Sequence, residues 1–507
     1  MTNGSAPDPR RWVSLAVLCA SLLVVVMDLT VLNVALPAIA ADLRPDSVQL
    51  LWIVDVYGLV VAGLLVTAGG LADRFGRRRM LLVGYLVFGV VPILVLVVDS
   101  PIGLIAVRAL LGVGGALIMP STMSMIRVLF TDARERAVAL GVWAAMAAVG
   151  GGLGPILGGL LVEGFGWHAA FLFNTPVMVI AGIAVAVLLP ESHGRRIPWD
   201  VLGIVLSVVG MTALMYAIKA IGKHGPATPE SAGALVLSVV ALAWFGRRCL
   251  RRPEPVLDIR LLRNGAMSAG LVTALVSSVA MGAMMLLLAQ WMQVVQEYGP
   301  IETGVRLLPL AVVSGVLSPL APRFAQAVGV RAMLAGGLAV GGAGFGALAF
   351  GGDHIGYPLV VVAQVLVGIS LATLAIGSAV IMAAVPPDRT GNATAMEETS
   401  FEIGSALGVA ILGSVAALVF RGLLTVGDLA AVGVTGSDAT AARESVSAAY
   451  ALADRPGVDG AELVARAGAA FTDSLAVVGL AGGALMLLSA VAVWFLTPRS
   501  TTVEETH

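Results

Sequence analysis

Charged residues are scarce in this chain of 507 residues. Asp, Glu, Lys and Arg make up 12% of it, against about 25% in soluble globular proteins, while hydrophobic residues make up 58%. The mean hydropathy is +0.97. No soluble fold buries so much apolar surface, so the composition excludes a soluble domain and indicates a membrane protein.

Lysine, cysteine and histidine are also rare. The two cysteines, Cys19 and Cys249, lie in no CxxC or metal-ligand spacing, so we expect both to be reduced and expect no metal site. The five histidines are scattered, which argues against an enzyme with clustered catalytic groups. The lack of a GxxxxGK(S/T) loop argues against ATP-driven transport. A net charge of -1, without a basic stripe outside the loops, argues against a nucleic-acid partner.

Long apolar runs dominate what the sequence does contain. A bilayer core of ~30 Å needs roughly 20 apolar residues per helix, and about fourteen such segments occur. They are residues 12–36, 48–70, 79–98, 102–125, 137–162, 167–189, 200–220, 231–248, 267–292, 304–325, 332–351, 357–384, 392–419 and 472–496. The first is too long for a cleaved signal peptide, so we expect it to be retained. We predict an all-α polytopic membrane protein with fourteen transmembrane helices.

Basic residues fall into alternate loops. The clusters are Arg74 with Arg77, Arg78 and Arg79, then Arg127, Arg134 and Arg136, then Arg195 and Arg196, and then six arginines between residues 247 and 263. By the positive-inside rule, these loops and both termini are cytoplasmic. The outer loops are expected to hold only Arg44, Lys219, Lys223 and Arg306. Arg outnumbers Lys 28 to 2, which is typical of a GC-rich bacterial genome, so we expect a bacterial inner (plasma) membrane protein.

The connection at residues 420–471 is long, and the alternation of loops places it outside. Its sequence predicts two short amphipathic helices around the turn at Arg455, Pro456 and Gly457. We expect an extracellular hairpin that caps the helices. A mobile tether is the alternative.

An internal repeat divides the helices into two halves. Leu-Ala-x-Arg-Phe occurs in GGLADRFGRRRML and again, eight helices later, in SPLAPRFAQAVGVRAML, where Pro322 replaces Asp73. This predicts two six-helix bundles that flank two inserted helices. The expected domains are a first bundle at 1–190, the inserted helices with a cytoplasmic linker at 191–265, and a second bundle at 266–507 that carries the 420–471 insert.

Ionisable residues inside predicted spans are the strongest functional signal, because charge in a bilayer is costly. At ~1.5 Å per residue, Asp28, Asp55 and Arg108 lie at similar depths in three spans, and we assign them to proton coupling. A carboxylate that faces a cavity holds its proton more tightly, and a nearby Arg reverses this effect. Asp28 is therefore the predicted proton carrier, tuned by Arg108. A static ion pair that holds the helices together is the alternative.

Glu398 and Glu402 in AMEETSFEIG are four residues apart and share one helix face, with Glu402 near mid-membrane. Such a pair can attract a lipophilic cation and release it on protonation. Glu397 points about 100° away and is expected at the inner rim. Met285 and Gln290 belong to a Met-rich face of the span at 267–292, which we assign to substrate contact; packing or lipid contact is the alternative.

Glycines recur at two places in the first half of the chain, in the span at 137–162 and around Asp73. Gly150, Gly154 and Gly158 are four residues apart, which predicts the close approach of a neighbouring helix, and tight packing alone is the alternative. Gly70 and Gly76 allow tight turns around Asp73, which is expected at the start of the third span, where Arg77 can pair with it. The alternative is that these arginines only set the topology.

Several of these strings resemble a known family. GGLADRFGRRR resembles the loop signature of the major facilitator superfamily, and MDLTVLNVALP, VRALLGVGGA, GGGLGPILGG and WHAAFLFNTP resemble its fourteen-span drug:proton antiporter branch. The resemblance implies an exporter driven by a proton gradient, without a cofactor. It implies a conformational latch at Gly70, Asp73, Arg74, Gly76 and Arg77, and an antiporter motif at Gly150, Gly154, Pro155, Gly158 and Gly159. Members of this branch have acidic residues that bind protons or cationic substrates, and the resemblance implies that these correspond to Asp28, Asp55, Glu398 and Glu402.

The expected function is proton-coupled efflux of hydrophobic, often cationic small molecules such as drugs, dyes and antiseptics. The expected partners are that substrate, protons and the lipid bilayer, and we expect a monomer. A dedicated exporter of one natural product or antibiotic is the main alternative, followed by an uptake symporter or a membrane enzyme. Ser314 stands where some relatives with divalent-cation substrates have an acid, which argues against bis-cationic drugs.

Overall fold

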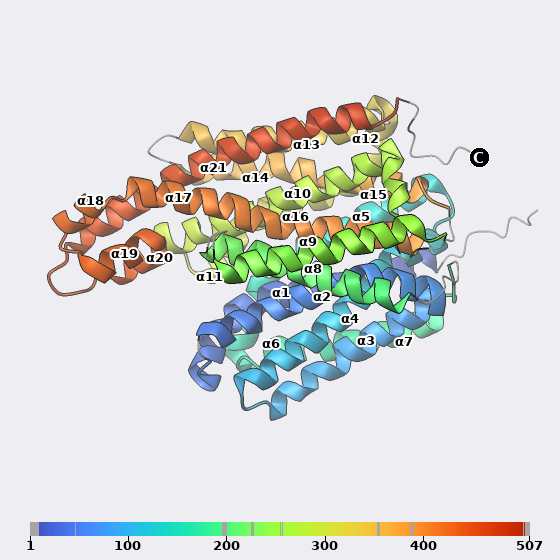
Figure 1. Ribbon diagram of the computed structural model, residues 1–507, viewed down its shortest axis with the longest axis horizontal. Coiled ribbons are helices and arrows are strands. Elements are labelled where there is room, and N and C mark those ends of the chain that lie inside the picture. Colours follow the sequence, from blue (N-terminus) through green and yellow to red (C-terminus); the bar gives the residue numbers. More distant parts are fainter. Residues whose placement is uncertain are drawn as a thin grey trace, which may run out of the picture.

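The computed structural model describes residues 10–45, 47–194, 200–224, 228–253, 255, 257–351, 355–386, 390–499 and 501. Regular structure in these ranges is helical throughout, as predicted, and the long helices run roughly along the longest axis of the molecule (Figure 1). Arg195 and Arg196, which the positive-inside argument used, lie outside the described part of the chain.

The helices follow one another in three groups. The first group comprises α1 (Arg11–Leu43), α2 (Ser47–Phe75), α3 (Arg77–Val90), α4 (Pro101–Leu129), α5 (Ala133–Phe165), α6 (Ala169–Leu172) and α7 (Asn174–Leu188). The second is the pair α8 (Val201–His224) and α9 (Pro229–Arg251). The third comprises α10 (Gly265–Gln290), α11 (Pro300–Leu317), α12 (Ala321–Val328), α13 (Val330–Ala347), α14 (Tyr357–Ala372), α15 (Leu374–Ala383), α16 (Thr390–Leu407), α17 (Gly413–Leu423), the short helices α18 (Val426–Ala431), α19 (Gly436–Glu444) and α20 (Val446–Ala451), and α21 (Gly460–Leu496).

The number of membrane spans agrees with the prediction. Among the described residues, 13 helical segments are long and apolar enough to cross a membrane, and α2 makes up to 14 when its two parts count as one span. These two parts, Trp52–Leu65 and Thr67–Phe75, are bent by 55° relative to each other. The chain is therefore a multi-pass membrane protein.

The predicted close approach at the glycine repeat is confirmed, and the neighbouring helix is α1. A Cβ on Gly154 would lie 1.7 Å from the Thr30 hydroxyl oxygen, and one on Gly158 would lie 3.2 Å from the Val31 Cα atom. A Cβ on Gly150 would likewise lie 2.9 Å from a backbone oxygen of α1. Glycine is thus required on this face of α5, since any side chain would force the two helices apart.

Two further residues that the resemblance assigns to an antiporter motif lie in the same helix. Gly159 is buried, and Pro155 is accommodated inside α5, which runs as one helix from Ala133 to Phe165. The first turn of α5 is tied to the start of α1 by an ion pair between Arg11 and Glu135, with 2.8 Å between nitrogen and oxygen.

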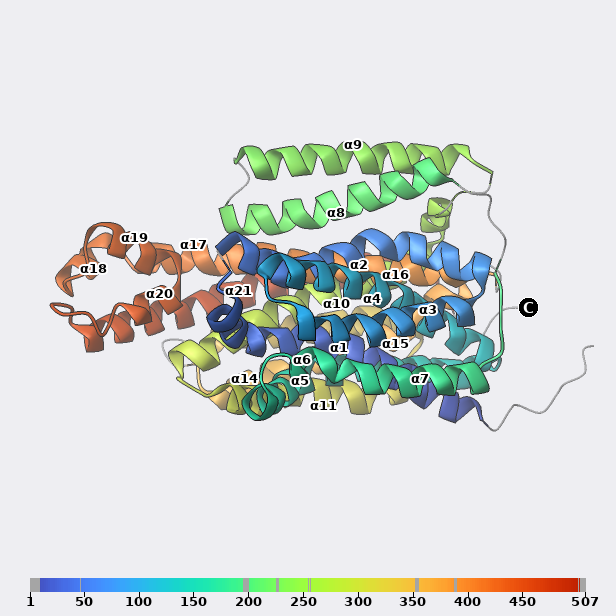
Figure 2. The same ribbon diagram turned by 90° about the horizontal axis from the view of Figure 1, so that it is seen from below.

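The pair α8 and α9 forms a separate layer on one side of the bundle (Figure 2). α8 packs against α2, and it also contacts α16, α17 and the π-helical turn Gly408–Leu412 that joins them. α9 packs mainly on α8. α8 therefore contacts helices that come both before and after it in the chain.

The internal repeat is visible in the backbone at two turns. Gly76 has a φ of 107° and precedes α3, while Gly329 has a φ of 86° and precedes α13. Only glycine adopts this region of φ readily. A helix break with a positive-φ glycine therefore follows each copy of Leu-Ala-x-Arg-Phe, directly after Phe75 in the first copy and with four residues between it and Phe324 in the second. Pro322 has replaced the acidic residue of the first copy.

The connection after α17 differs from the predicted hairpin. The three short helices α18, α19 and α20 come before the Arg455–Gly457 turn, and residues 460–471 after it are the first part of α21, not a separate helix. These short helices project beyond one end of the bundle, which we call the insert end; α21 ends toward the other end (Figure 1). That other end holds the arginine-rich α2–α3 turn, and we call it the basic end.

Candidate functional site

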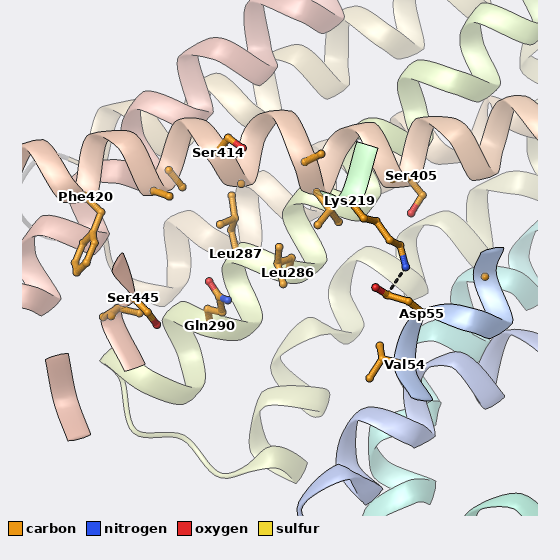
Figure 3. Close-up of a pocket in the computed structure, with 18 of the residues that line it drawn as sticks. Val54, Asp55, Lys219, Leu286, Leu287, Gln290, Ser405, Ser414, Phe420 and Ser445 are labelled. Atoms are coloured by element: carbon orange, nitrogen blue, oxygen red, sulfur yellow. Dashed lines mark hydrogen bonds and ion pairs between the residues drawn. The ribbon is translucent and has the colours of Figure 1, made fainter. Parts of the chain in front are cut away.

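Two neighbouring cavities lie among the helices. The larger has a volume of about 670 Å³ and the smaller about 170 Å³, and both are lined by Leu29, Glu402 and Ser405. The larger cavity runs from an ion pair of Asp55 and Lys219 toward Phe420 and Ser445 at the insert end (Figure 3). Most of the lining side chains are apolar, so the few charged groups determine where a charged molecule can bind.

Asp28 and Arg108 form a buried ion pair, as predicted. An Nη atom of Arg108 on α4 lies 2.6 Å from one carboxylate oxygen of Asp28 on α1, and the side chains are 1% and 2% exposed. The amide of Asn174 on α7 donates to the other oxygen at 2.8 Å. Arg108 also donates to the Ile53 carbonyl at 3.2 Å and lies 4.6 Å from the Tyr57 ring centre. One polar cluster thus joins α1, α2, α4 and α7.

The Asp28 cluster does not face the cavities directly. Among the described residues that line either cavity, its neighbour Leu29 appears and Asp28 does not. The second Nη atom of Arg108 and the Tyr57 hydroxyl are buried without a hydrogen-bond partner among the described residues. Arg108 therefore has one nitrogen available for a further hydrogen bond, and Asp28 has no direct contact with either cavity while the pair is intact.

Asp55 does not join this cluster, although the sequence placed it at the same depth. Its carboxylate pairs with the ammonium group of Lys219, and both side chains line the larger cavity. The prediction that Lys219 lies in an outer loop is wrong, because α8 extends to residue 224. Arg306 likewise lies within a helix, α11.

The three glutamates of α16 meet at the smaller cavity. Glu398 and Glu402 both line it, and because they are four residues apart within the helix α16 they share a face, as predicted. Glu402 also lines the larger cavity. The expectation that Glu397 sits at the inner rim is wrong: it is 7% exposed, lines the smaller cavity and accepts a hydrogen bond from Ser378 on α15. Ser314 lines this cavity as well.

Of the two residues on α10 that were assigned to substrate contact, one lines a cavity and the other does not. Gln290 lines the larger cavity beside Leu286 and Leu287 (Figure 3). Met285 packs against the buried core and is not among the described lining residues of either cavity, so its assignment does not gain support. Met281, one turn earlier, lines the smaller cavity instead.

The residues that the family resemblance assigns to a latch form a compact turn. Asp73 and Arg77 are buried and pair at 2.8 Å, as predicted. Asp73 lies in the last turn of α2, however, and not at the start of α3. Gly70 is helical, so only Gly76 makes the expected turn.

The same turn binds the segment that leads toward α8. The Arg77 amide donates to the Ser192 carbonyl at 2.9 Å, and the Gly194 amide donates to the Asp73 carbonyl at 2.8 Å. The Arg78 amide also donates to the Glu191 carboxylate at 3.2 Å. The Arg74 guanidinium lies 5.7 Å from the Phe75 ring centre.

Near the basic end, one arginine bridges the first and third groups of helices. Arg127 on α4 donates to the carbonyls of Met382 and Val385 at the end of α15, the latter at 3.0 Å. The linker between α9 and α10 is held to α16, because the Asp258 amide donates to the side-chain oxygen of Asn392 at 3.2 Å. The cavities lie on the insert side of these contacts.

The structure gives three further polar residues a place that the sequence did not predict. Asn174 and Lys219 lie in apolar helices, and Glu397, which the sequence placed at the inner rim, lies beside Glu398 in α16. Together the arrangement provides carboxylates in apolar cavities, which can bind a cation or a proton. In the described part of the chain, no group of His, Cys, Asp and Glu side chains could hold a metal ion.

Known proteins share both the sequence and the fold. A model of the Major Facilitator Superfamily matches residues 18–326. Multidrug efflux pump LfrA of Mycolicibacterium smegmatis is 35% identical, covering 96% of this chain and 96% of LfrA. Puromycin resistance protein pur8 of Streptomyces alboniger is 32% identical, covering 81% of this chain and 82% of pur8.

The human organic anion transporter MFSD10 (TETRAN) has a similar structure, with a TM-score of 0.62 at 13% identity, covering 96% of this chain and 100% of that one. At this identity the likeness concerns the fold alone. The family match over more than half of the chain, and the nearly full-length similarity to LfrA, lead to one conclusion: the chain belongs to the major facilitator superfamily.

Proposed function

We propose that this transporter exports hydrophobic, often cationic small molecules in exchange for protons. The observation that carries the proposal is the position of Glu398 and Glu402 in apolar cavities between helices from both parts of the chain. An ionised carboxylate there binds a lipophilic cation, and protonation releases it. The names of the relatives LfrA and pur8, a multidrug efflux pump and a puromycin resistance protein, support the direction of transport.

In this mechanism Asp28 carries a proton that is coupled to the movement of Arg108. Their pair is buried and shielded from the cavities, so proton uptake by Asp28 requires Arg108 to change partners. Asp55 and Glu402 line the larger cavity and exchange protons or cations there. The alternative of a purely static Asp28–Arg108 pair predicts that efflux depends on its stability but not on its titration.

The direction of export requires an orientation. We assign the basic end and both termini to the cytoplasm, because arginine-rich loops are retained on that side. The Asp73–Arg77 turn and the bridge made by Arg127 then close the cytoplasmic side while the larger cavity extends toward the outside. We further assign bundles at 1–190 and 266–507, inserted helices at 191–265, and a monomer as the working unit, in the plasma membrane of a bacterium.

Energetics favour more than one titrating carboxylate. One proton that enters down 100 mV yields about 2.3 kcal/mol, and each pH unit adds about 1.4 kcal/mol. For one-for-one exchange with a monovalent cation, the voltage contribution cancels. A second proton restores it, and Glu397, Glu398 and Glu402 provide sites for that proton.

The test measures efflux of ethidium and benzalkonium from an efflux-deficient bacterial host. We expect Asp28→Asn and Glu402→Gln each to abolish efflux, while the control Glu163→Gln, at an exposed position of α5, retains it. In proteoliposomes with an imposed pH gradient, substrate should dissipate the gradient for the wild type only. Proton-coupled efflux that survives in both variants would refute the site assignment.

A dedicated exporter of one compound is the second candidate, supported by the similarity to pur8. A panel of ethidium, tetraphenylphosphonium and puromycin separates the two. A multidrug exporter confers resistance to several members of the panel, whereas a dedicated exporter confers resistance to at most one.

A further inference from the structure

A lysine from the inserted helices enters the larger cavity. Lys219 on α8 pairs with Asp55 on α2, and both side chains line the cavity (Figure 3). The two side chains are 34% and 29% exposed, so they remain accessible from the cavity. The other charged lining residues are the acids Glu402 and Glu444. Lys219 is thus a cation at the place where the proposed substrate brings its own.

The two ion pairs near the cavities are built differently. Arg108 and Asp28 are almost fully buried, and Asn174 fixes the second carboxylate oxygen. Lys219 and Asp55 are partly exposed, and lysine offers a compact charge on a flexible four-carbon stem in place of the rigid fork of arginine. A partly exposed pair of this kind contributes little net free energy. Another cation can therefore replace Lys219 at the Asp55 carboxylate at a low cost in free energy.

Because Lys219 lies on α8 and Asp55 on α2, a cation that replaces Lys219 at Asp55 breaks an ion pair between these two helices. α8 contacts α2 on one side and α16 and α17 on the other. In the empty cavity the ammonium group neutralises Asp55, and a cationic substrate that approaches Asp55 must displace it. A neutral substrate does not compete with Lys219, because the Asp55 carboxylate does not attract it as it attracts a cation.

We propose that the Lys219 ammonium group is a tethered competitor of cationic substrates for Asp55, so that α8 helps to set the charge selectivity of the larger cavity. The proposal rests on the proposed function, since it concerns the same cavity. It adds a specificity-determining residue from outside the two helical bundles.

The test is equilibrium binding to purified protein in nanodiscs, with tetraphenylphosphonium as the cationic probe and triphenylphosphine oxide as its neutral analogue. Lys219→Met, which keeps the length of the side chain but removes the charge, should tighten tetraphenylphosphonium binding about tenfold and leave triphenylphosphine oxide unchanged. Lys219→Arg, which keeps the charge, should stay within about twofold of the wild type. The unchanged affinity for the neutral probe also shows that the variant is folded.

A double-mutant cycle ties the effect to Asp55. In an Asp55→Asn background, Lys219→Met should no longer tighten cation binding, because the carboxylate for which the two cations compete is gone. The proposal is overturned if Lys219→Met binds the cation no tighter than the wild type, or if both probes gain equally. Should the wild type expel the cation while Lys219→Met changes nothing, only this inference fails; if neither protein binds or expels the cation, the proposed function fails with it.

Discussion

Asp28 has both carboxylate oxygens occupied, one by Arg108 and the other by Asn174. A hydrogen bond to a charged group contributes about 1.5–3 kcal/mol, and a neutral one about 0.5–1.5 kcal/mol. Asn174→Ala should therefore lower the thermal midpoint of the purified protein more than Thr175→Val does. Thr175 is the matched neighbour, because its hydroxyl donates to the neutral Gly89 carbonyl at 2.8 Å. Equal midpoints for the two variants would contradict this account.

Single residues were predictable where charge alone gives the signal. Asp28, Arg108, Glu398 and Glu402 stand out because ionised groups in apolar segments are costly. Lys219 was missed because a lysine near the end of an apolar run reads as an interfacial anchor, and hydropathy does not reveal that α8 continues past it.

The positions of two other polar residues were not predicted, for different reasons. Asn174 is polar but uncharged, so its signal in an apolar helix is weaker than that of an ionised group. The position of Glu397 depends on which helices surround α16, and its angle from Glu402 does not contain that information. The partners of Asp55 are likewise a matter of how the helices pack.

At the scale of elements, the α1–α5 contact separates two glycines of one motif. A Cβ on Gly154 would lie 1.7 Å from the Thr30 hydroxyl oxygen, whereas one on Gly151 meets no atom within 4 Å. Gly154→Ala should force α1 from α5 and lower stability by about 1–3 kcal/mol, as overpacking does. Gly151→Ala should be neutral or stabilising by up to about 1 kcal/mol, since alanine favours helix. Thermal unfolding in detergent measures both, and a Gly154→Ala protein as stable as Gly151→Ala would refute the packing argument.

The two helix breaks of the repeat allow a second comparison. Gly76 and Gly329 both combine a positive φ with an extended ψ, a region that other residues rarely adopt, so alanine at either position is strained by about 1–3 kcal/mol. A Cβ on Gly76 would also lie 2.5 Å from the Glu191 carboxylate, while one on Gly329 meets nothing within 4 Å. Gly76→Ala should thus be the more destabilising variant, and Gly76→Ala combined with Glu191→Ala should approach the stability of Gly329→Ala. A combined variant no more stable than Gly76→Ala alone would show that the clash is unimportant.

Helix number and the repeat were readable from the sequence because apolar length and a recurring motif are local properties. The 420–471 connection was only partly readable. Its turn at Arg455 was recognised, but the residues that follow it look amphipathic whether they form a separate helix or extend the last span. The extension is decided by contacts of α21 with α17 and α20, which are not local in sequence.

For the whole molecule, the important feature is that Arg127 links the first and third groups of helices near the basic end. Its hydrogen bonds to the carbonyls of Met382 and Val385 favour the closed arrangement, and about 1.4 kcal/mol is enough for a tenfold shift in population. Arg127→Met should therefore lengthen distances across this end. Spin labels at Arg79→Cys and Phe324→Cys, in a background without Cys19 and Cys249, measure the change.

The matched control for this measurement is Arg263→Met, which removes an exposed arginine. We expect its distance distribution to equal that of the parent protein. A distribution for Arg127→Met that also equals the parent's would mean that other contacts hold the basic end closed.

The insert responds to pH in a definable direction. Thr425 donates hydrogen bonds to Asp428 through its hydroxyl and its backbone amide, and with Arg466 these hold the pKa of Asp428 below its usual value. A lowered pKa stabilises the folded insert at pH values above the ordinary pKa of about 3.9, and the stabilisation is lost as the pH falls through the lower folded value. Hydrogen exchange of residues 426–459 should be unchanged from pH 7 to about 5, once corrected for intrinsic rates, and should accelerate below about 4. Asp428→Asn should exchange faster throughout without this acid step, and an acid step that persists in Asp428→Asn would assign it to another group.

The 37 residues of α21 form one helix that begins at the insert and ends at the basic end. A continuous helix transmits tilt along its whole length, so reorientation of its membrane-embedded part displaces the insert as well. An antibody fragment that recognises only one position of the insert would then bind with an affinity that depends on whether a drug occupies the cavity. By reciprocity, the same fragment would change the affinity of the cavity for the drug by an equal factor.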